Sequence, residues 1–156
     1  MRKTNAIIGP MIKKNCVYCT NLDIKSRKIA ENDLAFAFLT NIPIVPGHTL
    51  IVPKRCIAKY RDLTPKEKEA IEELRKKITK ALEKAFGAKG FNYAWNENEV
   101  AGQAIPHFHL HVVPRKEGDA GIIEYEPRKF LYRPGSRETT PEKELEKVSE
   151  LIRKIV

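Results

Sequence analysis

Several residue types are scarce in this chain of 156 residues, and each scarcity excludes a class of protein. No apolar run approaches the roughly 20 residues of a membrane-spanning helix, so we expect no membrane partner. The apolar stretch near the start, Ala6 to Ile12, is short, is broken by Gly-Pro and lacks a signal-peptide cleavage site. Only three cysteines are present, too few for the disulfide framework of a small extracellular domain. These absences predict a cytoplasmic protein.

The residues that are present favour a globular protein. Hydrophobic residues make up 42% of the chain and charged residues 31%, as is usual for such domains. The net charge of +9 favours anionic partners. Lysines are largely interleaved with glutamates, as in the stretch from Lys66 to Lys77, a pattern more typical of a solvated helix than of a nucleic-acid site. We therefore expect anionic partners, but not specific binding of nucleic acid.

Three of only four histidines stand at alternate positions, His107, His109 and His111, with apolar residues between them. Successive side chains of a strand point to opposite faces, so the imidazoles would share one face and the apolar side chains the other. A random chain of this composition would show the pattern with a probability of about 0.003. The pattern predicts a strand whose imidazoles do chemistry or bind a ligand. The alternative is an exposed histidine-bearing strand or a chance metal-binding tract.

Three further strands are predicted from apolar alternation, at residues 34–39, 49–53 and 91–96. A long helix is predicted after Thr64, with Pro65 at its first position and Glu67 completing a capping box. A last helix begins near Pro141. Its apolar stripe comprises Leu145, Val148, Leu151, Ile152 and Ile155.

Half-polar strands with few crossover helices predict an α+β fold, an antiparallel sheet with flanking helices. We expect one domain over residues 1–156, with its core at about 15–115. Residues 116–156 would form a C-terminal extension that ends in the last helix and docks on the domain or on a partner subunit. Residues 122–132 favour neither helix nor strand.

Histidine can serve as a nucleophile and as a proton carrier near neutral pH. Alternate rings on a strand lie about 6.6 Å apart, so one can attack a substrate while another donates to a phosphate oxygen.

The pair Cys16 and Cys19, spaced C-x-x-C, indicates metal ligands or a redox pair. With His48 and one triad histidine it could form a Cys₂His₂ zinc site; the alternative is a reduced pair without a ligand. No βαβ context surrounds the pair, which argues against a redox protein. Cys56 is expected to be an ordinary, partly buried thiol.

The stretch from His107 to Val113 matches the pattern His-φ-His-φ-His-φ-φ, where φ is apolar, and resembles the signature of the histidine triad (HIT) superfamily. The resemblance covers roughly residues 15–115. It includes Ala101-Gly102-Gln103, the segment from Pro46 to Arg55, the segment from Ala35 to Leu39, and Cys16-x-x-Cys19. Residues 114–119 are similar to the branch that acts on dinucleoside polyphosphates.

The resemblance implies a nucleotide-binding hydrolase or nucleotidyltransferase acting at the α-phosphate of a dinucleoside polyphosphate or nucleoside phosphoramidate. His109 would attack phosphorus and form a covalent nucleotidyl-histidine, and His111 would contact the phosphate. Gln103 and Asn96 would hold the phosphate or the leaving-group side.

Zinc-containing members of the superfamily imply one structural zinc per chain, held by Cys16, Cys19, His48 and His107. The resemblance also implies a homodimer whose sheet continues across the interface.

Three positions depart from the family pattern. Thr40 stands where an Asp or Asn commonly contacts ribose, with Asn41 next to it. Ala104 stands where many members have a Ser or Thr that hydrogen-bonds the leaving group. Cys56 replaces a histidine that is frequent after Pro-Lys-Arg, with little expected consequence. The first two departures motivate a rival hypothesis, a nucleotide-binding module for sensing or interaction that scarcely turns over.

Overall fold

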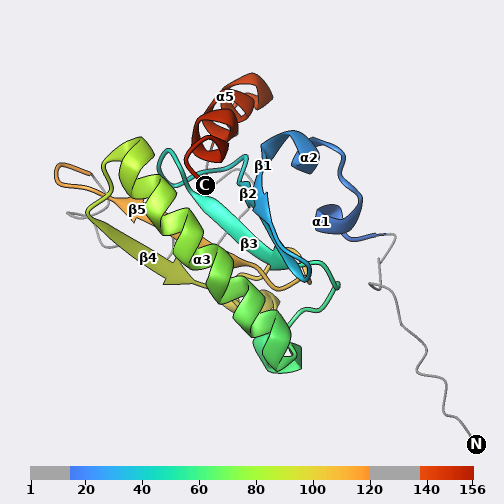
Figure 1. The fold of residues 1–156 in the computed structure, drawn as a ribbon. Helices are drawn as coiled ribbons and strands as arrows, with labels where there is room; N and C mark the ends of the chain where they lie inside the picture. Colours follow the sequence, from blue (N-terminus) through green and yellow to red (C-terminus); the bar gives the residue numbers. More distant parts are fainter. Residues whose placement is uncertain (1–14, 120–137) are drawn as a thin grey trace, which may run out of the picture.

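A computed structural model describes residues 15–119 and 138–156. Within these residues, five antiparallel strands form one sheet in the order β1-β2-β3-β5-β4, flanked by helices (Figure 1). The strands are β1 (Lys28–Glu31), β2 (Ala35–Leu39), β3 (Thr49–Pro53), β4 (Gly90–Ala94) and β5 (Leu110–Arg115). The helices are α1 (Val17–Thr20), α2 (Asp23–Arg27), α3 (Pro65–Phe86) and α5 (Glu142–Arg153), with 3₁₀ turns η1 (Tyr60–Asp62) and η2 (Glu99–Ala101). The predicted α+β class is confirmed.

The predictions for the N-terminal stretch and for residues 122–132 lie outside the described residues. No helix in the described ranges is long and apolar enough to cross a membrane.

The two faces of the sheet bury different side chains because alternate residues of each strand point to opposite sides. Helix α3 packs on the face that carries Phe108, Leu110 and Val112, as the alternation predicted. On the opposite face, Phe38 and Leu50 pack with Ile24 of α2 in a smaller apolar cluster. Helices α1 and α2 thus lie on the face that also carries the triad histidines.

Two strand predictions needed correction. The edge strand β1 was not predicted, because its four residues lack a clear apolar alternation and its pairing with β2 is interrupted by a bulge. The histidine segment was predicted to be a strand from residue 107, but β5 begins at Leu110. Just before it, the Phe108 N–H donates to the Ile57 carbonyl, which lies outside the β3–β5 ladder. His107 and His109 therefore lie on an irregular approach to the strand.

Helix α5 docks on the domain, one of the two alternatives for the C-terminal extension. Leu145 and Ile152 join the core that α3 covers, and Val148 and Ile155 pack against it. The predicted stripe was wrong at Leu151, which is 46% exposed. Ser149 is fully buried on this face, as Ile152 is, and its hydroxyl donates to the Arg27 carbonyl. The hydroxyl is accommodated because a backbone acceptor lies within reach.

The capping box predicted at Thr64 is present. The Thr64 hydroxyl accepts from the Glu67 N–H, and the Glu67 carboxylate accepts from the Thr64 N–H. The same buried carboxylate also accepts from Nε and Nη2 of Arg55 at 2.9 and 2.8 Å. Helix α3 ends at Gly87, whose φ of 64° is the left-handed conformation that glycine adopts most readily.

We expect Glu67→Gln to lower the free energy of unfolding by about 1–3 kcal/mol at neutral pH, because glutamine retains a capping oxygen but loses the charge that faces Arg55. The hydrogen bond from Arg55 holds the pKa of Glu67 below its ordinary value. The carboxylate's contribution is therefore present above that ordinary value and is lost as the pH falls through the lowered one. The difference between the two proteins should shrink below about pH 4, as measured by denaturant titration. Glu69→Gln, at an exposed position of the same helix, is the control and should stay within about 0.5 kcal/mol at every pH.

Candidate functional site

A cavity of about 220 Å³ lies on the sheet face opposite α3, beneath α1 and α2. His109 and His111 contribute polar rings to its wall. Apolar side chains from four elements supply another part of the lining: Val17, Ile24, Phe38 and Leu50. Thr40, Asn41 and Asn96, all predicted to bind nucleotide, also line it. Five of the six predicted nucleotide-binding residues are therefore brought together around one cavity.

The backbone decides which nitrogen of His109 faces the cavity. Nδ1 lies 2.8 Å from the His107 carbonyl, which can only accept, so Nδ1 carries the proton and Nε2 keeps a lone pair. Burial lowers the pKa of His109 below its ordinary value, although the hydrogen bond to the backbone opposes this. The ring of Tyr18 lies edge-on with its centroid 5.4 Å from that of His109, and contributes to this burial. His109 is thus a neutral imidazole with an unprotonated Nε2.

His111 is oriented by His48 rather than by the backbone. The Ile44 N–H donates to Nδ1 of His48, so the proton of His48 is on Nε2. That N–H donates over 2.9 Å to Nδ1 of His111, which leaves Nε2 as the proton-bearing nitrogen of His111. This chain from Ile44 through His48 makes His111 a hydrogen-bond donor at the cavity.

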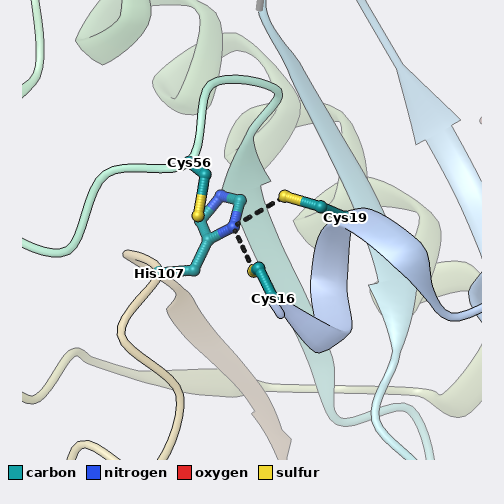
Figure 2. A group of neighbouring side chains, drawn as sticks. All are labelled: Cys16, Cys19, Cys56 and His107. Atoms are coloured by element: carbon teal, nitrogen blue, oxygen red, sulfur yellow. Dashed lines mark hydrogen bonds between the residues drawn. The ribbon is translucent and has the colours of Figure 1, made fainter. Parts of the chain in front are cut away.

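His107 lies among three cysteines (Figure 2). Its Nε2–H donates to the Pro53 carbonyl over 2.8 Å, so Nδ1 carries the lone pair. This nitrogen faces the sulfurs of Cys16 and Cys19 at 3.3 and 3.7 Å. Cys56, in the loop after β3, completes the group, in which the four ligand atoms lie within 4.8 Å of one another. The result is a Cys₃His cluster that joins three separate parts of the chain.

The cluster fits a tetrahedral metal ion. With Zn–S near 2.3 Å and Zn–N near 2.0–2.1 Å, sulfur and nitrogen ligands stand about 3.6 Å apart, close to both distances at His107. A carbonyl that accepts from the other ring nitrogen is the usual support of a metal-bound histidine. Burial, together with hydrogen bonding to Cys16, raises the pKa of the Cys19 thiol to about 12. A divalent cation would therefore displace protons as it binds.

The cluster in the structure differs from the predicted ligand set at one position. His48 does not join the cysteines, because its two ring nitrogens are engaged with Ile44 and His111. Cys56, expected to be an ordinary thiol, is the fourth residue of the cluster and is 2% exposed. The sequence could have indicated Cys56 as a ligand, because it stands where the family frequently has a histidine. Cysteine and histidine are both residue types that bind zinc.

Gln103 is the one predicted nucleotide-binding residue that does not appear in the cavity wall. Its side-chain amide donates to the Ala58 carbonyl and accepts from the Asn98 N–H. Asn98 has a φ of 68°, and its carbonyl accepts from the Gln103 N–H. Gln103 therefore braces the loop whose residues Gly102 and Ala104 do line the cavity.

Fold and site together define a class: a small α+β protein in which an antiparallel sheet presents a buried neutral imidazole to a cavity, beside a cluster able to hold a metal. Comparison with models of protein families identifies one family. The chain belongs to the HIT domain family, whose model matches residues 21–118.

Relatives of known sequence extend this result. A 16.1 kDa HIT-like protein of Mycoplasma pneumoniae is 37% identical over 121 residues, 76% of this chain and 83% of the relative. A bis(5'-adenosyl)-triphosphatase of Dictyostelium discoideum is 32% identical over 123 residues, 78% of this chain and 79% of the relative. An adenosine 5'-monophosphoramidase of Schizosaccharomyces pombe is 34% identical over 110 residues, 69% of this chain and 80% of the relative.

Solved structures agree. A HIT-like protein of Bartonella henselae superposes with a TM-score of 0.73 at 28% identity, over 92% of this chain and 98% of that one. A Zn-bound histidine triad family protein of Mycobacterium smegmatis superposes with a TM-score of 0.68 at 27% identity, over 90% and 92%.

Proposed function

We propose that this protein is a nucleotide hydrolase that cleaves at the α-phosphate, with His109 as the nucleophile. The observation that carries the proposal is the hydrogen bond from Nδ1 of His109 to the His107 carbonyl, because it leaves the Nε2 lone pair at the cavity. A neutral ring held in one tautomer needs no proton transfer before it attacks.

The reaction would have two steps. Nε2 of His109 attacks the α-phosphorus, the bond from phosphorus to the leaving group breaks, and the leaving group departs with the bonding electrons. Water then attacks the phosphorus of the nucleotidyl-histidine, the P–N bond breaks, and a nucleoside monophosphate is released. His111, a donor through Nε2, would stabilise charge on a phosphate oxygen in both steps. If an acceptor other than water attacked the same intermediate, the protein would act as a nucleotidyltransferase.

The other predicted residues would contact different parts of the nucleotide. Asn96 would hold the phosphate or the leaving group, and Gln103 would act through the loop that it braces. For ribose, Asn41 is the better candidate. Both residues line the cavity, but the Thr40 hydroxyl already accepts from the Ile42 N–H.

The relatives include enzymes for two substrate classes, a triphosphatase and a phosphoramidase. Ala104 favours the first class for this chain, because it lines the cavity without a hydroxyl to protonate a leaving group. A nucleoside polyphosphate leaves as a stable anion, whereas an amine must be protonated as it departs.

We expect the wild-type protein to prefer dinucleoside polyphosphates over nucleoside phosphoramidates. Ala104→Ser should raise kcat/KM for phosphoramidates by about 10-fold, the lower limit for a positioned proton donor, with little change for dinucleoside polyphosphates. Parallel assays of both substrates with both proteins measure this. Equal changes for the two classes would contradict the preference, and Ala101→Ser, in the same loop but outside the cavity wall, is the control.

We further propose that Cys16, Cys19, Cys56 and His107 hold one structural zinc per chain. When bound, zinc would cross-link α1, the loop after β3 and the segment before β5, and so fix His107, whose carbonyl holds Nδ1 of His109. The Zn-bound relative supports this choice of metal.

A homodimer in which two β4 strands pair is also proposed. Strand β4 is at one end of the sheet, and Tyr93 and Trp95 beside that edge are each 43% exposed. An edge strand with aromatic neighbours suits pairing with a second copy, which sedimentation measurements would detect.

The proposed function is tested with a panel of dinucleoside polyphosphates and nucleoside phosphoramidates. Turnover with a trappable nucleotidyl-histidine is the expected result. Nucleotide binding without turnover across the panel would instead support the rival hypothesis of a sensing or interaction module. The absence of a leaving-group donor at Ala104 is what motivates that hypothesis.

A further inference from the structure

The C-terminal segment reaches the nucleotide cavity, although it lies outside the stretch that matches the family model. Thr139 contributes to the cavity wall. The Thr140 N–H donates to the Asn41 carbonyl over 2.8 Å, and the Glu142 carboxylate lies 3.3 Å from Nε of Arg27. Both Asn41 and Arg27 line the cavity. The segment that leads into α5 therefore contributes one wall residue and contacts two others.

Arg27 is the buried cation of this cavity. Its side chain is 4% exposed, its Nη1 donates to the Leu39 carbonyl, and its guanidinium lies 5.8 Å from the centre of the Phe38 ring. Burial lowers the pKa of Arg27, and Glu142 is the foremost of the charges that oppose this. No hydrogen bond among the described residues uses Nη2, so this nitrogen keeps donors for a ligand.

The register of the sheet shows where Arg27 lies relative to the histidines. His111 pairs with Leu50, Leu50 pairs with Phe38, and Phe38 pairs with Lys28, the residue after Arg27. Each step crosses one strand spacing of about 4.8 Å. A nucleotide with its α-phosphorus at His109 would lay its base on Leu50 and Phe38. Arg27 then lies at the end of the series His111, Leu50, Phe38 that is remote from His111, beside the base.

We propose that Arg27 is a binding residue for the nucleobase and that Glu142 of α5 is its positioning residue, so that the C-terminal helix completes the nucleotide site. The proposal rests on the proposed function, because it takes a nucleotide as the ligand. A guanidinium carries only donors, so it would bind acceptor atoms on the base edge. The Glu142 carboxylate lies 3.3 Å from Nε as an ion-pair partner without a hydrogen bond, and Nη2 is left for the ligand.

The test separates binding from chemistry. Because Arg27 is remote from the reacting phosphorus, Arg27→Met should weaken nucleotide binding about 10-fold or more and leave kcat within about 2-fold. Glu142→Gln, which retains Arg27, should raise KM and the Kd for AMP or GMP several-fold. In the double variant, Glu142→Gln should add little to Arg27→Met, since it acts through that residue. Calorimetric titration with AMP and with GMP gives Kd without turnover.

Glu144→Gln is the matched control, because Glu144 is exposed in the same first turn of α5 and has no contact with Arg27. A merely structural role for the pair would lower Tm and leave KM and Kd unchanged, and that result would overturn the inference. If the wild type binds AMP or GMP but hydrolyses no substrate, the proposed hydrolase fails and this inference is still decided by Kd. If the wild type binds neither nucleotide, both fail.

Discussion

His109→Ala should reduce kcat/KM for the best substrate of the panel by at least about 10³-fold, while Tm changes by only a few degrees. The ring of His109 is 7% exposed and makes one hydrogen bond within the described residues, to the His107 carbonyl. Its removal deletes the Nε2 lone pair without disturbing the core beneath α3. Steady-state assays of both proteins, with thermal unfolding beside them, measure the effect.

Two further readouts make this test specific. The wild type, quenched during turnover, should carry a nucleotidyl group on histidine, and His109→Ala should carry none. The variant should still bind AMP, because the remaining cavity wall is intact. Equal turnover by the two proteins would exclude His109 as the nucleophile.

Substitution of Cys56 should remove zinc, whereas substitution of His48 should not. Cys56→Ser should lower the zinc content from one per chain towards zero and Tm by about 10 °C, because the free energy of binding a structural zinc contributes to folding. His48→Ala should keep one zinc per chain and instead lower kcat, since Nδ1 of His111 loses its donor. Metal analysis of purified protein, thermal unfolding and assays give the three readouts.

Cys56→His is the matched control for this pair of variants. It restores a nitrogen ligand that zinc binds at about 2.0–2.1 Å, so it should retain metal. Loss of zinc in His48→Ala together with full zinc in Cys56→Ser would contradict the Cys₃His cluster and restore the ligand set expected from the sequence.

Local patterns in the sequence predicted much of this structure. The capping box predicted at Thr64 begins α3, because a cap satisfies backbone groups within a few residues. Alternation placed Phe108, Leu110 and Val112 against the core. The same logic missed β1, whose four residues form a strand only because β2 pairs with them.

The different positions and roles of the three triad histidines could not be predicted from the sequence. Alternation put three equivalent rings on one face, whereas the structure places His107 with cysteines and His109 and His111 at the cavity. The cause is the irregular approach to β5, where Phe108 bonds Ile57 and the regular pleat has not begun. The choice between His48 and Cys56 likewise depended on distances across the sheet.

By itself the sequence determined the fold class, the family resemblance and the residue types at the site, because periodicity, caps and motif spacing are properties of neighbouring residues. Only the tertiary structure decided which nitrogen of each histidine carries a proton, which sulfur completes the cluster, and that Glu142 meets Arg27. These depend on contacts between segments far apart in the chain, and folding brings such segments together through the summed burial of the whole core rather than through any local signal.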